Sequence, residues 1–82
     1  MIYTKKFLLE KGIHDLAKTT LFEGRFGRNI TLFADEPIEF AYDDESETFP
    51  LLPNTYWQDD GEFTKLFIRT EGPTTLWVRL RN

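Results

Sequence analysis

Apolar and polar residues alternate along several short stretches of the chain, and this period of two predicts β-strands. The clearest stretches are two runs rich in aromatic and branched residues, FTKLFIRT (63–70) and TTLWVRL (74–80). The connection between them is Glu71-Gly72-Pro73, and a short glycine-containing loop between two such runs is typical of a hairpin. We therefore expect an antiparallel C-terminal hairpin in which Thr70 pairs with Thr74.

Alternation gives this predicted hairpin two different faces. One is aliphatic and is the candidate core face, with Thr64, Leu66, Ile68, Leu76, Val78 and Leu80. The other is aromatic and basic, with Phe63, Lys65, Phe67, Arg69, Trp77, Arg79 and Arg81. We interpret the aromatic-basic face as a contact surface. The simpler interpretation is that the Lys and Arg stems only cover the rings.

The same alternation predicts two more strands upstream. NITLFAD (29–35) places Ile30, Leu32 and Ala34 on one side, and IEFAY (38–42) follows Pro37. A proline is tolerated where a strand begins, because its missing N–H costs least there. The acidic run DDESE (43–47) predicts a solvated loop, and Asp-Gly in QDDGE (58–62) predicts a turn into the hairpin.

The first 28 residues leave alternatives open. YTKKFLLEKG (3–12) fits a short helix capped by Thr4 and ended by Gly12, or a strand followed by a Lys-Gly turn. TLFEGRF (20–26) alternates and favours another strand. We expect one all-β domain over residues 1–82, a small antiparallel β-sandwich or barrel. Residues 29–81 form the sandwich in this prediction, and residues 1–28 add a short N-terminal arm or helix and the first strands.

The stretch FPLLPNTYW (49–57) combines large apolar residues with two prolines that would interrupt a core strand. Pro50 and Pro53 stiffen the chain, so a loop can present its apolar side chains at a lower entropic cost. Those side chains are Leu51, Leu52, Tyr56 and Trp57. We interpret the loop as an anchor for another subunit, and a lid over the end of the sandwich is the alternative.

Composition and size favour a partner for these side chains. A chain of 82 residues buries only roughly 60–65% of its unfolded surface. It nevertheless contains eight Phe, two Trp and three Tyr, each able to bury about 150–250 Å². One small core does not easily enclose so many rings, and an exposed apolar patch is typical of a partner site. We therefore expect a homo-oligomer.

Charge is separated along the chain. The net charge is −4, which makes general nucleic-acid binding unlikely, because that affinity comes mainly from neutralising phosphates. All ten Lys and Arg residues lie outside residues 29–64, whereas most of the acidic residues lie within them. This separation suits head-to-tail contacts between copies or docking on a charged lattice. Acidic loops that only keep the protein in solution are the alternative.

Residues suited to catalysis are few. There is no Cys, His14 is the single His, and the single Ser, Ser46, lies in an acidic loop where carboxylates oppose a nucleophile. We expect no enzyme activity, no cofactor and no metal site. The acidic runs could bind Ca²⁺ or Mg²⁺, although neither matches an EF-hand.

Other binding motifs are weak. Pro50-Leu51-Leu52-Pro53 matches PxxP, the motif that SH3-type domains bind, but it has no basic flank. The aromatic-basic face could stack single-stranded bases. No run is long enough for a membrane span or secretion signal.

Three segments, ITLFADEPIEFAYDD, TFPLLPNTYW and KLFIRTEGPTTLWVRL, together resemble the small β-sandwich virion proteins of tailed bacteriophages. That group includes capsid decoration (cement) proteins and head–tail or tail accessory proteins. The resemblance covers residues 29–81 and rests on fold patterning: an Ile-x-Leu strand, a strand near a Pro, a Phe/Pro loop and a closing hairpin. Asn54 stands where similar proteins often have a glycine-containing turn.

The resemblance implies a non-enzymatic virion structural protein, made in the host cytoplasm, with capsid decoration as the first expectation. Its partners would be itself, with a trimer favoured, and the major capsid or another virion protein. A head–tail connector or tail accessory role is the alternative within this class. A carbohydrate-binding or inhibitory module is the alternative outside it, with Tyr56, Trp57 and Trp77 as aromatic platforms. The expected interface comprises the FPLLPNTYW anchors and the aromatic-basic face.

Overall fold

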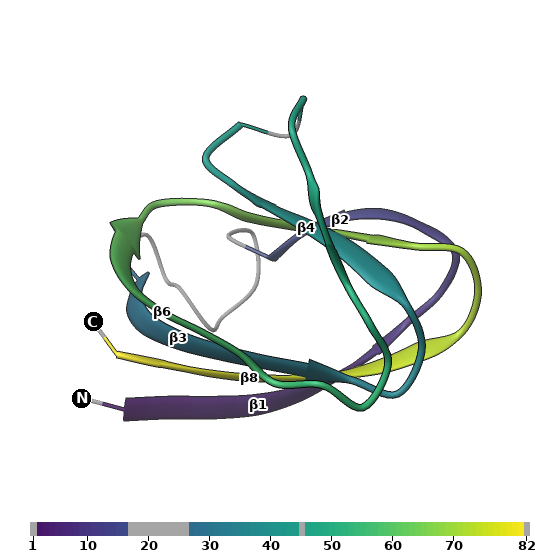
Figure 1. The fold of residues 1–82 in the computed structure, drawn as a ribbon, viewed down its shortest axis with the longest axis horizontal. Helices are drawn as coiled ribbons and strands as arrows, with labels where there is room; N and C mark the ends of the chain where they lie inside the picture. Colours follow the sequence, from purple (N-terminus) through teal and green to yellow (C-terminus); the bar gives the residue numbers. More distant parts are fainter. Residues whose placement is uncertain (1, 17–26, 45, 82) are drawn as a thin grey trace.

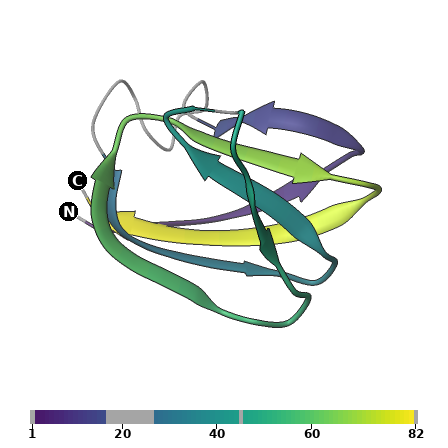
Figure 2. The ribbon, with the colours of Figure 1, turned by 45° about the horizontal axis from the view of Figure 1, so that its top comes forward.

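Eight antiparallel β-strands form two facing sheets. The computed structural model describes residues 2–16, 27–44 and 46–81. The strands are β1 (Ile2–Leu9), β2 (Gly12–Asp15), β3 (Gly27–Ala34), β4 (Ile38–Tyr42), β5 (Phe49–Leu51), β6 (Trp57–Phe63), β7 (Leu66–Thr70) and β8 (Thr74–Arg81). Sheet A has the order β1-β8-β3-β6, and sheet B has the order β2-β7-β4-β5. The sheets are the two layers of a sandwich (Figures 1 and 2), which confirms the predicted fold class.

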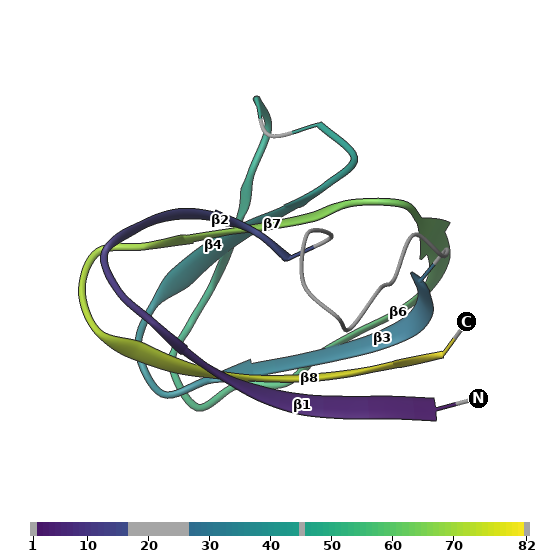
Figure 3. The ribbon, with the colours of Figure 1, turned by 180° about the vertical axis from the view of Figure 1, so that it is seen from behind.

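The chain crosses between the sheets at nearly every connection, and only β4 and β5 are consecutive neighbours in one sheet. This strand order, with four strands in each sheet, is the arrangement of a jelly roll. β1 pairs with β8 over its whole length, from Ile2 opposite Arg81 to Leu9 opposite Thr74. The first and last strands therefore lie side by side, and both described ends of the chain are at the same end of the sandwich (Figure 3).

The core lies between the sheets and is filled mainly by alternate residues of β3, β4, β7 and β8. The predicted inward residues are buried, among them Ile30, Leu32, Ala34, Ile38, Phe40, Leu66, Ile68, Leu76, Val78 and Leu80. Strand side chains point alternately to the two faces of a sheet, so one apolar residue in two is enough to fill this core. The period-two pattern therefore predicted the faces of these strands correctly.

The predicted C-terminal hairpin is wrong. β7 pairs with β2 and β4 in sheet B, whereas β8 pairs with β1 and β3 in sheet A. Residues 71–73 carry the chain from one sheet to the other. The aliphatic faces of both strands meet in the same core in either arrangement, so alternation alone does not separate a hairpin from a crossover.

The prediction of an N-terminal arm or helix is also wrong, because residues 2–9 form strand β1. The alternative of a strand followed by a Lys-Gly turn is correct: Lys11 lies in a bend, and Gly12 begins β2 with φ of 138°. A positive φ is a conformation that favours glycine. The strand expected within TLFEGRF (20–26) lies outside the described residues.

The run 63–70 is not one strand, because it breaks at Thr64 and Lys65. The Asp43 carboxylate binds the chain at this break: its Oδ1 accepts the N–H of Thr64 at 2.7 Å and that of Lys65 at 2.9 Å. The same oxygen accepts the Thr64 hydroxyl at 2.8 Å. The break changes the alternation, so Phe63 points into the core with Leu66 and Thr64 is exposed, opposite to our prediction for both.

Residues 49–63 form more strand than we expected. The predicted loop contains β5, and the predicted turn at Gly61 lies within β6. Pro50 fits β5 because this strand is at the edge of sheet B, and within sheets proline is confined to edge strands, strand starts and bulges. Leu51 pairs with Ile38 and belongs to the core, with 6% of its surface exposed. It is therefore not the surface anchor that we predicted.

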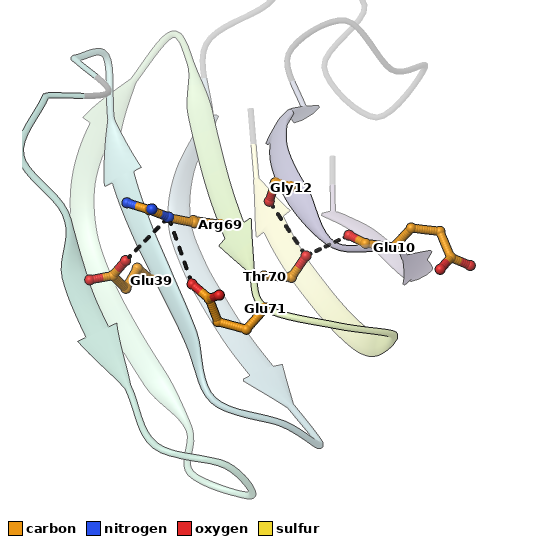
Figure 4. Close-up of polar contacts among 6 residues, drawn as sticks. All are labelled: Glu10, Gly12, Glu39, Arg69, Thr70 and Glu71. Carbon is orange, nitrogen blue, oxygen red and sulfur yellow. Dashed lines mark hydrogen bonds and ion pairs between the residues drawn. The ribbon is translucent and has the colours of Figure 1, made fainter.

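Two polar side chains of β7, Thr70 and Arg69, contact neighbouring residues (Figure 4). The buried Thr70 hydroxyl donates to the carbonyl of Glu10 and lies 3.4 Å from the carbonyl of Gly12, which ties the β1–β2 turn to sheet B. On the outer face of sheet B, Arg69 lies 3.8 Å from Glu39 and 3.9 Å from Glu71. These ion pairs are exposed, so each contributes at most about 1 kcal/mol.

Leu51 and Leu52 provide a matched test of this core. We expect Leu51→Ala to lower the free energy of unfolding by about 2–4 kcal/mol, because it removes buried methyl groups. Leu52 is 71% exposed, so Leu52→Ala should change it by less than about 0.5 kcal/mol. Urea unfolding followed by circular dichroism measures both. Equal effects of the two substitutions would contradict the burial of Leu51.

The bonds to Asp43 predict a dependence of stability on acid. Desolvation raises the pKa of Asp43, but the bonds from Thr64 and Lys65 outweigh it and leave the pKa below its ordinary value. A lowered folded pKa gives a contribution that is present above the unfolded pKa, about 3.9, and is lost as the pH falls through the folded pKa. Asp43 has φ of 61°, which Asn also tolerates, so Asp43→Asn removes the charge alone. Urea unfolding from neutral pH to below pH 3 should show a shallower acid-induced loss for Asp43→Asn, and an unchanged slope would exclude this role.

Candidate functional site

The outer face of sheet A is the candidate site because three aromatic rings gather on it. Trp77 of β8 lies between Lys6 of β1 and Phe33 of β3 in the ladder. The Phe33 ring is 5.5 Å from that of Trp77 and 4.7 Å from that of Tyr56. We call Phe33, Tyr56 and Trp77 the aromatic cluster. Trp77 is 39% exposed and Tyr56 is 71% exposed, so the cluster presents ring surface to solvent.

The turn between β5 and β6 brings Tyr56 to this face. Asn54 has φ of 58°, and its N–H donates to the carbonyl of Ala34, the last residue of β3, at 2.8 Å. This bond fixes the turn against β3, two residues before Tyr56. Asn is among the few residues that adopt this left-handed conformation readily, so it does here what a glycine does in other turns.

Two shallow depressions lie on this face and share Thr31, Gln58 and Arg79. The first has a volume of about 250 Å³ and is lined by Thr4, Thr31, Phe33, Tyr56, Gln58, Trp77, Val78 and Arg79. The second has a volume of about 240 Å³ and is lined by Ile2, Asn29, Ile30, Thr31, Gln58, Asp59, Asp60, Arg79, Leu80 and Arg81. The face thus runs from an aromatic end to a polar end.

Charge changes sign across sheet A. The described residues of β1 and β8 carry no acidic residue, and Lys6, Arg79 and Arg81 are their basic residues on the outer face, while Lys5 is on the core-facing side of β1. Strand β6, at the opposite edge, carries Asp59, Asp60 and Glu62 and no basic residue. The separation along the sequence therefore becomes a separation in space. A partner that meets the β1–β8 half of the face meets aromatic and positive groups together.

A second group of rings lies inside the sandwich and holds β6 against sheet B. The ring centroids of Phe40 and Trp57 are 5.2 Å apart, and those of Tyr42 and Phe63 are 4.9 Å apart. Trp57 Nε1 donates to the Tyr42 hydroxyl at 2.9 Å. Burial raises the pKa of Tyr42 to about 12; the Trp57 bond opposes this shift and the Asp59 charge adds to it.

The structure divides the predicted interface residues among different places. Trp77, Arg79 and Arg81 lie on the outer face of sheet A, whereas Phe67 and Arg69 lie on that of sheet B. Lys65 is in the β6–β7 connection and Leu52 is exposed beside β5. Leu51, Trp57 and Phe63 pack in or against the core. The single aromatic-basic face that we expected does not exist, because it required the hairpin.

Phe33 is the site residue that sequence reasoning missed. The alternation of residues 29–35 places it opposite Ile30, Leu32 and Ala34, so its outward direction was readable. The contact of Phe33 with Tyr56 and Trp77 could not be predicted from the sequence, because it depends on the pairing of β3 with β8 and on the β5–β6 turn.

The residues considered for catalysis or metal binding lie elsewhere. His14 Nε2 is 2.7 Å from the carbonyl of Glu10, and the N–H of exposed Ser46 donates to Asp44. Accepting that bond lowers the pKa of Asp44. Within residues 2–16, 27–44 and 46–81, no three His, Asp or Glu side chains come together as a metal site requires. No helix in this part of the chain is long and apolar enough to cross a membrane.

Comparison with known proteins supports the fold only. No protein-family model and no curated protein matches the sequence. A similar solved structure is the solution NMR structure of a de novo designed double-stranded β-helix, with a TM-score of 0.63. The match covers 96% of this chain and 99% of the designed chain at 12% sequence identity. The fold is a double-stranded β-helix. At this identity the likeness carries no information about function.

The buried Tyr42 hydroxyl predicts a loss of stability in alkali. A tyrosine with a raised folded pKa contributes stability below its unfolded pKa, about 10, and this contribution is lost as the pH rises toward the folded value of about 12. Tyr42→Phe removes the Trp57 hydrogen bond, so we expect it to lower the free energy of unfolding by about 1 kcal/mol at neutral pH. Between the unfolded and folded pKa values, the stability of this variant should depend less on pH than that of the wild-type protein. Chemical unfolding at several pH values measures this, and parallel pH curves for the two proteins would contradict it.

Proposed function

We propose that the protein is a non-enzymatic docking protein of a bacteriophage virion, first of all a capsid decoration protein, that binds the assembled shell through the outer face of sheet A. The observation that carries this proposal is the exposed aromatic cluster beside Lys6 and Arg79. Trp, Tyr and Arg are the residue types that dominate binding energy in protein interfaces.

The cluster is suited to docking because its geometry is set before a partner arrives. Phe33 and Trp77 stand on two paired strands, and the turn at Asn54 is bonded to β3. Rigid aromatic side chains on a sheet lose little conformational entropy on binding. A protein that binds a completed lattice better than its free subunits stabilises that lattice by mass action.

The virion setting comes from the sequence pattern of residues 29–81, and jelly rolls are among the architectures of viral capsid domains. In this proposal the chain is made in the host cytoplasm and then joins the particle. The same docking face would serve a head–tail connector or tail accessory protein, which differ from decoration in their partner.

Carbohydrate binding is the second candidate, and the first depression favours it. Trp77 and Tyr56 rings border this depression together with the polar side chains of Gln58 and Arg79. Aromatic surface combined with a few convergent polar groups is typical of small-ligand sites. Trp57 does not take part, because it packs against the core.

Trp77→Ala tests the docking face. We expect it to weaken binding to assembled shells by roughly 30-fold or more, as removal of a central aromatic residue from an interface costs about 2 kcal/mol or more. Phe49→Ala is the matched control, because Phe49 is 63% exposed but lies on β5 of sheet B. Co-sedimentation with purified capsids of the source phage measures both. Equal retention of both variants, with wild-type melting temperatures, would overturn the proposal.

A fluorescence titration separates the two candidates. The chain has two tryptophans, so Trp57→Phe leaves Trp77 as the only reporter on the docking face. A change in its emission with oligosaccharides, and none with capsids, would replace docking by carbohydrate binding. The reverse result supports docking, and an inhibitory module would respond to neither.

A further inference from the structure

Sheet A ends in two strand edges of opposite charge. β1 and β6 are its outermost strands, and in the described part of the chain no strand pairs with their outer sides. β1 carries Lys5 and Lys6, whereas β6 carries Asp59, Asp60 and Glu62. β1 and β6 are opposite edges of the sheet, and in Figure 3 β1 is the edge nearer the viewer. An edge strand presents unpaired N–H and C=O groups, so it is a template for pairing with another strand.

Each edge also carries one charged residue on its core-facing side. Lys5 is opposite the buried Val78, and its Nζ lies 5.8 Å from the centre of the Phe7 ring. Asp59 is opposite the buried Ile30, and its Oδ1 accepts the N–H of Gly61. Neither residue forms an ion pair with another described residue.

Inward charges at an edge prevent pairing with an arbitrary strand, because the incoming strand would bury them. They also prevent each edge from pairing with its own copy, since Lys5 would come near a second Lys5, and Asp59 near a second Asp59. Like charges across a strand pair are destabilising, and opposite charges are stabilising. The β1 edge and the β6 edge are therefore matched to each other.

We propose that β1 of one copy pairs with β6 of the next, so that sheet A continues from molecule to molecule. β1, β8, β3 and β6 alternate in direction because each neighbouring pair is antiparallel. A second copy that presents its β1 beside β6, with the same face outward, therefore forms another antiparallel pair.

One register satisfies both edges at once. With Lys5 of one copy opposite Asp59 of the other, Phe7 is opposite Trp57, because the residue numbers of an antiparallel pair have a constant sum. Phe7 and Trp57 are both partly buried residues packed against the core, so the contact would cover the apolar surface left at each edge. The charged pair and the apolar pair are thus satisfied in the same register.

The contact joins two different surfaces, so it is heterologous and forms a ring if its rotation closes. The outer faces of sheet A then lie on one side of the assembly, with one aromatic cluster from each copy. This inference concerns the edges and does not rest on the docking function of the face. Trp77→Ala would leave it intact, and loss of association between copies would leave Trp77 available to a partner.

Complementary edge variants test the proposal by analytical ultracentrifugation at low salt. The basic-edge variant is Lys5→Glu with Lys6→Glu, and the acidic-edge variant is Asp59→Lys with Asp60→Lys. Each alone should lose the oligomer that the wild-type protein forms. An equimolar mixture should associate again, with the two variants alternating, because the β1 edge of each variant is opposite in charge to the β6 edge of the other. All four substitutions in one chain should restore the wild-type oligomer. Association should also weaken at about 1 M salt, where the Debye length is about 3 Å.

Two controls keep the result decisive. Glu36→Lys with Glu71→Lys changes the net charge by as much as the acidic-edge variant but lies away from both edges, and should retain the oligomer. Circular dichroism and amide hydrogen exchange show whether each variant is folded, and in the wild-type protein the outward N–H groups of β1 and β6 should gain protection on association. A wild-type protein that remains monomeric at every attainable concentration would overturn the proposal. So would folded edge variants that still associate, or a mixture that stays monomeric.

Discussion

The two sheets bury their inward side chains against each other in one apolar layer, and the rest of the structure depends on this constraint. Leu32 and Val78 from sheet A meet Leu66 and Ile68 from sheet B in one apolar layer. Because inward side chains fill this layer, the outward ones are free to differ in chemistry. Trp77 therefore lies on a solvent-facing surface although both of its neighbours in the chain are buried.

Acidic residues have a structural role where the chain leaves a strand. Asp35 follows β3 and accepts the N–H of Thr75, while Asp43 follows β4 and accepts those of Thr64 and Lys65. The N–H groups of both aspartates also donate to the carbonyls of Thr75 and Lys65. In each sheet an aspartate directly after a strand thus extends the hydrogen bonding to the neighbouring segment by using its carboxylate. These acidic side chains therefore stabilise the fold, besides contributing charge to the surface.

Sequence pattern alone gave the strand class and the direction of most side chains, because alternation is local. Leu66, Ile68, Leu76 and Val78 could be placed in the core without knowledge of pairing. Pairing depends on which sheet a strand joins, and here Thr70 and Thr74 belong to different sheets although three residues separate them. Strand β6 could not be recognised because Asp59, Asp60 and Gly61 have poor strand propensity. Its pairing with β3 holds these residues in a strand from both sides, since Asp59 pairs with Ile30 and Glu62 with Arg28, with a register shift between the two pairs. Part of the candidate site could be predicted from the sequence, because Trp77, Arg79 and Tyr56 were among the predicted interface residues. Phe33, their neighbour, could be recognised only from the folded structure.

The pairing of Ile2 with Arg81 has a consequence for how the molecule forms. β8 lies between β1 and β3, so sheet A stays divided until residues 74–81 are in place. During synthesis β1 would leave the ribosome before β8, and it could pair with this neighbour only after the strands between them had followed. Contacts between residues so far apart in the chain are typical of slow folding, and in the interval the Lys residues of β1 keep a lone strand from pairing with other nascent chains.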